Sequence, residues 1–230
     1  MSRAILVLGQ SGSGKSTSLE NLDPKETFII QPFNKDLPFK GWKTNYPLYD
    51  KTTKKGNRFV TTTASTAVSI MDIISKAEGL YSHLNQVKTI IVDDLQYWMA
   101  AEFMEKTKEK GFEKFNSMAL NFYSFLKTSG ELRDDLTVIL LCHTEDNIID
   151  GEKSTTIKTL GKMIDSKITA EGMFTIVLYT HVTKTDKGVT YNFRTNTNGN
   201  DTCKSPKGMF EYLIPNDLQY VLTKIKEYEN

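Results

Sequence analysis

A glycine-rich loop that directly follows an apolar strand is the feature that most constrains this chain. Residues 9–16 read GQSGSGKS and match the pattern G-x-x-x-x-G-K-[S/T] without a departure, after an apolar run over Arg3–Leu8 that predicts a buried strand. Glycines let the backbone turn so tightly that successive N–H groups converge on the oxygens of a bound phosphate. A helix is expected from Gly14 to Leu22, and the positive end of its dipole would add to this attraction. The loop therefore predicts a binding site for nucleotide phosphates.

The side chains of this phosphate loop (residues 9–16) have distinct expected roles. Lys15 is expected to reach the β- and γ-phosphates of a nucleoside triphosphate, and the Ser16 hydroxyl is expected to ligate Mg²⁺. The predicted nucleotide-binding residues are Gly9, Gln10, Ser11, Gly12, Ser13, Gly14, Lys15, Ser16 and Thr17.

Polar residues at the ends of two later apolar strands are expected to complete the site. Asp93 follows the apolar run at 89–92 and would hold Mg²⁺, directly or through water. Asp94 would orient or deprotonate the attacking water. Alternatively, one of the two acids caps a helix that begins near Leu95. His143 ends the apolar strand that begins at Thr137, where it would either contact the γ-phosphate or have a structural role.

Buried apolar strands alternate with amphipathic helices along the first part of the chain, which indicates a mostly parallel central sheet flanked by helices. Two β-rich runs flank the turn signal at Asp186–Gly188 and predict a C-terminal β-hairpin, which makes the sheet mixed. We expect one α/β domain over residues 1–230, with an irregular insertion at about 31–58. The predicted helices carry the apolar positions Ala67, Ile70, Met71 and Ile74; Phe115, Met118, Ala119, Phe122 and Leu126; and Leu218, Val221, Leu222 and Ile225.

The order of loop, acid and polar residue resembles that of the additional-strand P-loop ATPases, which include the RecA-like and AAA+ groups, over roughly Arg3 to His143. More specifically, the stretches IIVDD, LLCHTED and DTCKSPKGMFEYLIPNDLQYV resemble small phage-encoded ATPases with a RecA-like core. This resemblance implies a Mg²⁺-dependent ATPase that acts in DNA recombination, single-strand annealing or replication. One departure is Gln31, which follows the second strand where RecA-like recombinases usually carry a catalytic glutamate.

The same resemblance implies assembly into a homo-oligomeric ring or filament. In such assemblies a basic residue of one subunit completes the site of its neighbour, and Arg194 and Lys184, on the two arms of the late hairpin, are the candidates. An arginine finger of this kind is worth about 10³ to 10⁵ in rate.

Other classes of P-loop protein remain as alternatives. VTKTD, at residues 182–186, resembles the guanine-recognition motif of GTPases, but Gln96 and Tyr97 stand where a GTPase has its glycine. A nucleotide kinase would clamp phosphates with several arginines, whereas the four arginines here are scattered along the sequence. A nucleotide-switched adaptor, such as a helicase loader, is the third alternative.

The formal net charge of +1 creates no global attraction for nucleic acid, so DNA binding would need a local patch. Residues 35–58 contain seven basic and two acidic residues with interleaved aromatics, a composition that suits single-stranded DNA. Alternatively, this is a solvated insertion whose aromatics pack into the core. The candidate DNA contacts are Lys40, Trp42, Lys43, Lys54, Lys55 and Arg58.

The cysteine content and the lengths of the apolar runs indicate the cellular compartment. The two cysteines, Cys142 and Cys203, form neither a disulfide framework nor a metal-ligand cluster, which is typical of a reducing compartment. No apolar run approaches the ~20 residues that cross a bilayer, and the N-terminal MSRAILVLG is too short for a signal peptide. We therefore expect a protein of the cytoplasm, the host cytoplasm if it is phage-encoded, with no membrane partner.

Overall fold

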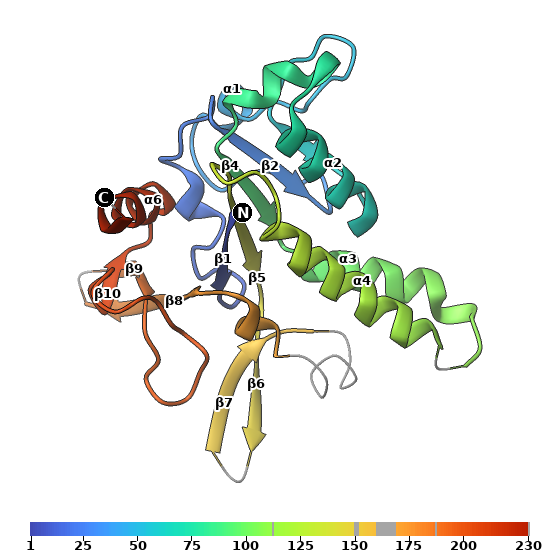
Figure 1. Cartoon of the computed structure of the whole chain (residues 1–230). Helices are drawn as coiled ribbons and strands as arrows, with labels where there is room; N and C mark the ends of the chain where they lie inside the picture. The colour runs from blue at the N-terminus through green and yellow to red at the C-terminus, as the bar shows by residue number, and fades with distance from the viewer. Residues whose placement is uncertain (112, 150–151, 160–168, 187, 230) are drawn as a thin grey trace.

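Eight strands form the central sheet of the computed structural model, which describes residues 1–111, 113–149, 152–159, 169–186 and 188–229 (Figure 1). The strand order is β10-β9-β8-β1-β5-β4-β2-β3, and β6 pairs with β7 in a separate hairpin. The strands are β1 (Arg3–Leu8), β2 (Thr27–Gln31), β3 (Arg58–Val60), β4 (Thr89–Asp93), β5 (Thr137–Cys142), β6 (Thr144–Ile149), β7 (Glu152–Ile157), β8 (Ile176–Thr185), β9 (Gly188–Arg194) and β10 (Leu213–Pro215).

The pairing of the strands confirms the predicted fold class. From β8 through β1, β5, β4 and β2 to β3 every pair is parallel, whereas β8–β9 and β9–β10 are antiparallel. The strand β5 lies between β1, which leads into the phosphate loop, and β4, which ends at Asp93. This is the additional-strand, RecA-like arrangement. The late hairpin makes the sheet mixed, as expected.

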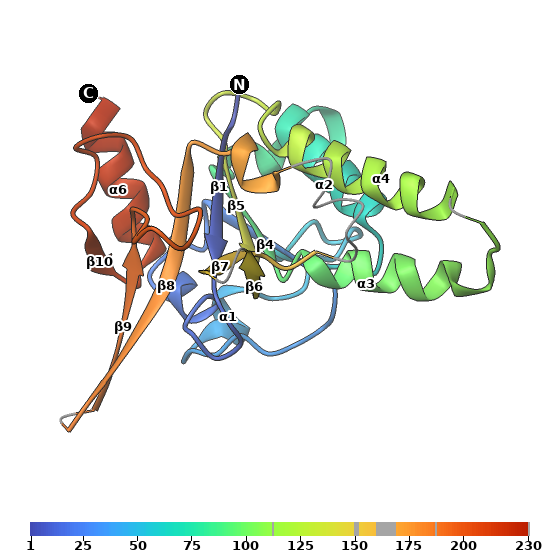
Figure 2. The same cartoon turned by 90° about the horizontal axis from the view of Figure 1, so that it is seen from below.

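Helices cover both faces of the sheet (Figures 1 and 2). Helices α2, α3 and α4 pack on one face, and α6 packs on the other with the short helix η1. The helices are α1 (Trp42–Asn45), α2 (Ala64–Lys76), α3 (Gln96–Glu105), α4 (Glu113–Ser129) and α6 (Leu218–Glu229), with the 3-10 helices η1 (Thr17–Leu19), η2 (Gly79–Gln86), η3 (Lys106–Lys108) and η4 (Ala170–Met173).

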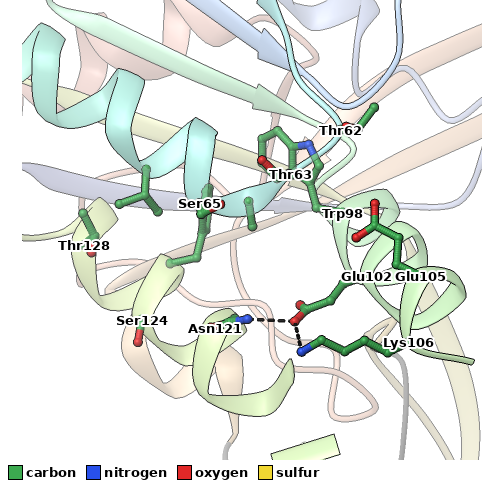
Figure 3. Close-up of a pocket in the computed structure, with 13 residues that line it drawn as sticks. Thr62, Thr63, Ser65, Trp98, Glu102, Glu105, Lys106, Asn121, Ser124 and Thr128 are labelled. Atoms are coloured by element: carbon green, nitrogen blue, oxygen red, sulfur yellow. Dashed lines mark hydrogen bonds and ion pairs between the residues drawn. The ribbon is translucent and has the colours of Figure 1, made fainter. Parts of the chain in front are cut away.

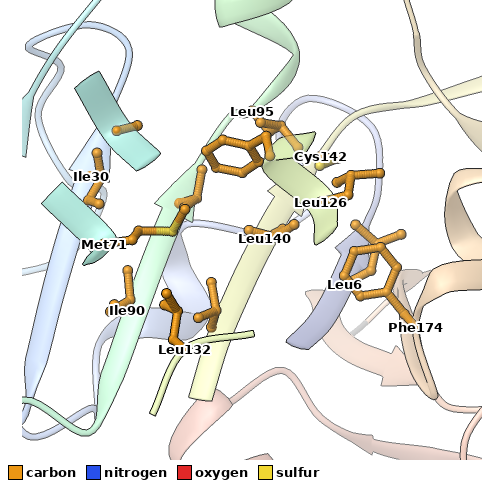
Figure 4. Packing of buried hydrophobic residues seen from close by; sticks show 14 of the residues in the cluster. Leu6, Ile30, Met71, Ile90, Leu95, Leu126, Leu132, Leu140, Cys142 and Phe174 are labelled. Carbon is orange, nitrogen blue, oxygen red and sulfur yellow. The ribbon is translucent and has the colours of Figure 1, made fainter. Parts of the chain in front are cut away.

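Alternation along each strand divides the core into two layers. In β1, Leu6 and Leu8 face the layer of α2, α3 and α4, whereas Ile5 and Val7 face the layer of α6. Figure 4 shows Leu6, Leu140 and their neighbours packed in the first layer. Because the central strands are covered on both faces, they read as continuous apolar runs.

The prediction of a helix from Gly14 to Leu22 is wrong. Only the 3-10 turn Thr17–Leu19 is helical here. The hydroxyl residues after Lys15 favour this outcome, because the Ser18 hydroxyl donates to the Lys15 carbonyl (2.6 Å) and so competes with helical backbone bonds. Pro24 limits the remaining length. A helix dipole therefore adds little to the phosphate loop.

The segment at 31–58 lacks long helices and strands: it contains the short helix α1, and its first and last residues belong to β2 and β3. Two of its aromatics belong to the core: Tyr46 is fully buried, and Phe39 packs against it edge-to-face with ring centroids 6.1 Å apart. The Tyr46 hydroxyl donates to the Leu22 carbonyl (3.2 Å), which ties the segment to the residues after the phosphate loop. For these two rings, the alternative of aromatics packed into the core is the correct one.

Two hairpins extend from the sheet. Figure 2 shows β8 and β9 leaving the body as a two-stranded arm, formed by exposed residues at 181–186 and 188–191. Lys187, within the predicted turn, lies outside the described residues. The β6–β7 hairpin, which directly follows His143, was not predicted. No helix in the described part of the chain is long and apolar enough to cross a membrane.

Candidate active site

The phosphate loop lies at the carboxyl edge of the sheet, where β1 ends between β5 and β8. The Gly9 N–H donates to the last carbonyl of β5 (3.1 Å), and the Ser13 hydroxyl donates to the Gln10 carbonyl (2.6 Å). Gly12 and Gly14 have φ angles of 74° and 96°, in the left-handed region that favours glycine. The glycines of the motif are therefore needed for the backbone path of the loop.

The side chain of Lys15 is held inside the loop. Its ammonium donates to the carbonyls of Gly9 (2.8 Å) and Gln10 (3.0 Å), and the residue is only 4% exposed. Burial lowers the pKa of Lys15, and the negative charge of Asp94 offsets part of this effect. The loop thus contains a buried cation at the position expected to contact phosphates.

Asp93 is fully buried and contacts the phosphate loop directly. The Ser16 hydroxyl donates to Oδ1 of Asp93 (2.9 Å), so the two residues predicted to hold Mg²⁺ lie together. The amide of Gln31 donates to Oδ2 (3.0 Å) from the neighbouring strand β2. Parallel pairing brings the carboxyl ends of β2 and β4 to the same edge, which explains this meeting of residues far apart in sequence.

The residues at this point fit a magnesium ion. A hydroxyl and a carboxylate are hard oxygen ligands, the type that Mg²⁺ prefers. The ammonium of Lys35 lies 3.2 Å from Oδ2 of Asp93, so a cation already occupies the space beside this carboxylate. Within the described residues no cluster of three or more His, Cys, Asp or Glu side chains is suited to a metal. Ser16 and Asp93 would therefore share the ion with phosphate oxygens and water.

Asp94 turns into the site from the end of β4. Its φ of 70° lies in the left-handed region, which aspartate tolerates better than most residues. One carboxylate oxygen lies 3.3 Å from Nε2 of His143, and the other accepts from the ammonium of Lys35. Burial acts to raise the pKa of Asp94, but these hydrogen bonds and charges outweigh it and hold the pKa well below the usual value. The carboxylate does not cap α3, because the capping position, Leu95, has no side-chain cap bond.

Lys35 is a site residue that the sequence analysis did not identify. It comes from the irregular segment, yet its ammonium bridges the carboxylates of Asp93 and Asp94. Burial acts to lower the pKa of Lys35, but the two carboxylates outweigh burial and raise it. One sequence signal was available: Lys35 follows the end of β2 by four residues, and the ends of parallel strands meet at one edge.

Arg58 is not a surface residue, so its predicted DNA contact is wrong. It is 4% exposed, and its guanidinium donates to the side chains of Gln31 (3.1 Å) and Asn34 (3.0 Å) and to the Tyr46 carbonyl (3.1 Å). Burial lowers the pKa of Arg58, and Asp36 offsets part of this effect. Because Gln31 bridges Arg58 and Asp93, its amide positions the metal-side carboxylate.

A pocket of about 300 Å³ lies beside the phosphate loop. Residues of the loop line it together with Lys35, Asp94 and His143. Tyr191, from the β8–β9 arm, completes the lining. The pocket therefore combines a phosphate-binding loop with the carboxylate and imidazole that could act on water.

Comparison with protein families identifies the chain. Residues 1–206 match the family described as AAA domain. The chain belongs to this AAA domain family. Together with the intact phosphate loop, this membership makes the protein a P-loop ATPase.

Two solved structures are similar to this chain at low sequence identity. A KaiC-like protein from Pyrococcus horikoshii OT3 is 12% identical, with a TM-score of 0.46 over 84% of this chain and 78% of that chain. The flagellar accessory protein FlaH from Methanocaldococcus jannaschii is 11% identical, with a TM-score of 0.42 over 84% and 76%. The search of curated proteins found no match.

Arg194 does not have the geometry of an arginine finger in this AAA domain. Its guanidinium pairs with Asp201, lies 5.6 Å from the ring centroid of Tyr179, and its side chain is only 13% exposed. It lies opposite Tyr179 at the base of the arm, not at the tip. A finger needs a free guanidinium that reaches a neighbour, so this prediction is corrected. Lys184 is exposed near the tip and stays a prediction.

The other predicted DNA contacts of the AAA domain lie at the surface. Lys40, Lys43, Lys54 and Lys55 are exposed, whereas Trp42 is half-buried beneath the guanidinium of Arg58, 5.0 Å from the ring centroid. Lys54 and Lys55 line a groove of about 460 Å³ together with Lys25. Of the basic residues predicted to contact DNA, the four lysines are therefore accessible at the surface, whereas Arg58 is buried.

A further pocket, of about 370 Å³, lies between α2, α3 and α4 (Figure 3). Its lining includes Trp98 and a polar network. In this network the carboxylate of Glu102 accepts a hydrogen bond from the Asn121 amide (2.7 Å) and forms an ion pair with Lys106 (2.9 Å). No residue of the phosphate loop lines it. This pocket is therefore separate from the active site of the AAA domain.

The geometry also bears on the alternative classes. Among the described residues that line the phosphate-loop pocket there is no arginine, so the clamp typical of a nucleotide kinase is not assembled there. Residues 182–185 of the GTPase-like motif form part of the exposed arm and do not line the pocket.

Proposed function

We propose that this AAA domain binds Mg·ATP in the phosphate-loop pocket and hydrolyses it with a water molecule activated by Asp94. The observation that carries the proposal is the convergence of three groups on one pocket: the Ser16–Asp93 contact, the buried Lys15 ammonium, and Asp94 between Lys35 and His143. Release of phosphate from Mg·ATP by the wild-type protein tests it.

Binding and charge neutralisation are assigned to the loop. Its backbone N–H groups and the Lys15 ammonium would bind the phosphates, and Ser16 and Asp93 would hold Mg²⁺. When bound, Mg²⁺ neutralises charge on the phosphate oxygens. Gln31 stands where RecA-like recombinases usually have a catalytic glutamate. Because it has no carboxylate, its role here is to hold Asp93 in place through a hydrogen bond from its amide.

Proton transfer is assigned to Asp94. Its lowered pKa keeps the carboxylate ionised at neutral pH, so it can orient the attacking water. Because a lowered pKa also makes the carboxylate a weaker base, it would accept the proton only as the oxygen adds to the γ-phosphorus and the water becomes more acidic. The bond between the γ-phosphorus and the oxygen that bridges to the β-phosphorus breaks, ADP leaves with that oxygen, and the products are ADP and phosphate. His143 is a positioning residue, because its Nε2 lies 3.3 Å from Asp94 and limits the directions that the carboxylate can take. His143 also lines the pocket, where it would lie near the γ-phosphate of bound ATP.

Lys35 is expected to compete with Mg²⁺ for Asp93, because the ammonium already lies 3.2 Å from Oδ2. A Lys35→Met variant should reach half-maximal turnover at a Mg²⁺ concentration about 5-fold lower, which corresponds to roughly 1 kcal/mol of lost competition. Its melting temperature without Mg²⁺ should fall, since two buried carboxylates lose their counter-charge. Mg²⁺ titration of turnover and thermal unfolding measure both effects. Lys40→Met, at an exposed lysine of the same segment, is the control, and an unchanged Mg²⁺ requirement in Lys35→Met would contradict the competition.

We further propose that the ATPase acts on single-stranded DNA, in recombination, annealing or replication, as the resemblance to phage-encoded ATPases implies. The supporting observation is the groove lined by Lys25, Lys54 and Lys55. Asp23 is an acidic residue of the same lining, so the three lysines leave the groove with an excess of positive charge. Lysines in such a groove can follow a phosphate backbone without reading sequence.

A Lys54→Glu/Lys55→Glu double variant is expected to bind single-stranded DNA more weakly than the wild-type protein. Loss of two phosphate contacts should reduce the slope of log affinity against log salt concentration by about 1.4. Fluorescence anisotropy with a labelled oligonucleotide at several salt concentrations measures this slope. Lys127→Glu is the control, since Lys127, on α4, pairs with Glu131 and does not line the groove. Identical affinities and slopes in all three proteins would exclude this groove.

Assembly into a ring or filament is part of the same proposal. The β8–β9 arm supports it, because Val182 and Val189 are exposed on a hairpin that extends from the body (Figure 2). Lys184, near the tip of the arm, would complete the site of a neighbouring subunit.

A further inference from the structure

Tyr191 contacts the phosphate loop from the β8–β9 arm. Its Cδ1 atom lies 3.1 Å from the position that a Cβ on Gly14 would take, so the ring packs directly against the loop. Tyr191 is nevertheless 45% exposed, which leaves much of the ring free. It is the sole Phe, Tyr or Trp among the described residues that line the pocket.

Asn216 lies beside Tyr191 on the same glycine. Its side-chain oxygen is 2.9 Å from the Cβ position of Gly14, at the residue that directly follows β10. The side-chain Nδ2 is buried, and no described residue accepts a hydrogen bond from it. A buried amide without a partner is costly. Asn216 does not itself line the pocket, so its Nδ2 would meet an acceptor on a ligand there only after the side chain turns past Gly14.

The lining of the pocket combines two kinds of chemistry. Asp94, Lys35 and His143 supply charged and polar groups, whereas Tyr191 provides an aromatic surface beside Gly14. Phosphates need the first kind of surroundings, and a nucleobase needs the second, since its flat faces stack on aromatic rings and its edge carries hydrogen-bond acceptors.

We propose that the adenine base of the nucleotide stacks on the ring of Tyr191 and accepts a hydrogen bond from the amide of Asn216. The inference rests on the proposed function, because the phosphate loop must hold the triphosphate. It adds a base subsite built from β9 and the residue after β10, which ties nucleotide binding to the position of the β8–β9 arm. A polyphosphate without a base would gain nothing from this subsite.

Binding of ATP and of inorganic tripolyphosphate, each with Mg²⁺, tests the base subsite by isothermal titration calorimetry. Tyr191→Ala should weaken ATP binding by about 5- to 150-fold, the effect of one stacked base, and leave tripolyphosphate binding unchanged. Tyr191→Phe keeps the ring and should bind ATP like the wild-type protein. Asn216→Ala should weaken ATP binding by about 2- to 10-fold, again without an effect on tripolyphosphate. Tyr212→Ala, at an exposed tyrosine outside the pocket, is the matched control.

The outcomes separate this inference from the function on which it rests. Equal weakening of both ligands by Tyr191→Ala, or no weakening of either, would overturn the base subsite, because the effect would then not depend on a base. Loss of ATP affinity in Tyr191→Phe would also overturn stacking. Loss of both ligands in Lys15→Ala reports on the phosphate loop, and a wild-type protein that binds neither ligand would overturn both proposals.

Discussion

A Lys15→Ala variant is expected to hydrolyse ATP at least about 100-fold more slowly than the wild-type protein, the usual cost of removing one preorganised charge from a reacting phosphate. ATP affinity should fall as well, since this ammonium is the buried cation of the loop. Phosphate release and calorimetric binding measure the two effects.

The fold should survive this change. Burial lowers the pKa of Lys15, which means that the folded protein stabilises the ammonium less than water does. The melting temperature of Lys15→Ala is therefore expected to equal or exceed that of the wild-type protein. Lys88→Ala, at a lysine paired with Asp135 elsewhere on the surface, is the matched control. Wild-type turnover in the Lys15 variant would show that the loop is not the site of hydrolysis.

An Asp94→Asn variant is expected to retain ATP binding and to lose about 10²- to 10⁴-fold in turnover, the contribution of a general base. Asparagine is the suitable replacement, because it tolerates the left-handed φ of 70° at this position and keeps the shape of the side chain. Alanine would add backbone strain to the chemical change.

This variant also separates an enzyme from a nucleotide-switched adaptor. If hydrolysis drives the activity, Asp94→Asn abolishes it; if ATP only sets a conformation, the variant keeps or prolongs the ATP-bound state. Asp36→Asn, at an exposed acid that lines the same pocket, is the control and should leave turnover unchanged. Turnover within about threefold of wild type in Asp94→Asn would remove the residue from the mechanism.

The parts of the site that depend on strand ends could be predicted from the sequence. The motif at 9–16 and the acid at the end of β4 suffice to bring Ser16 and Asp93 together, because parallel strands end at one edge of the sheet. His143 beside Asp94 follows from the same rule. Asp93 and His143 each directly follow a buried apolar run that is easily recognised, and Ser16 belongs to a motif of fixed spacing.

The parts that depend on long-range packing could not be predicted. Lys35 and Arg58 were counted together as surface charges, yet one reaches the catalytic carboxylates and the other is buried on Gln31. Charge patterning reports neither burial nor partners. The arginine-finger prediction for Arg194 likewise did not take into account Asp201, whose carboxylate pairs with the guanidinium. Tyr191 lies near the loop only through the pairing of β8 with β1, which no local signal reveals.

The most direct test of the account is phosphate release from ATP by the wild-type protein, with Mg²⁺ and after its chelation, in the absence of any acceptor nucleotide. The account predicts release that requires Mg²⁺, stops on chelation and is lost in Lys15→Ala. Tight ATP binding without phosphate release, or transfer of the phosphate to a nucleoside monophosphate instead of water, would contradict it.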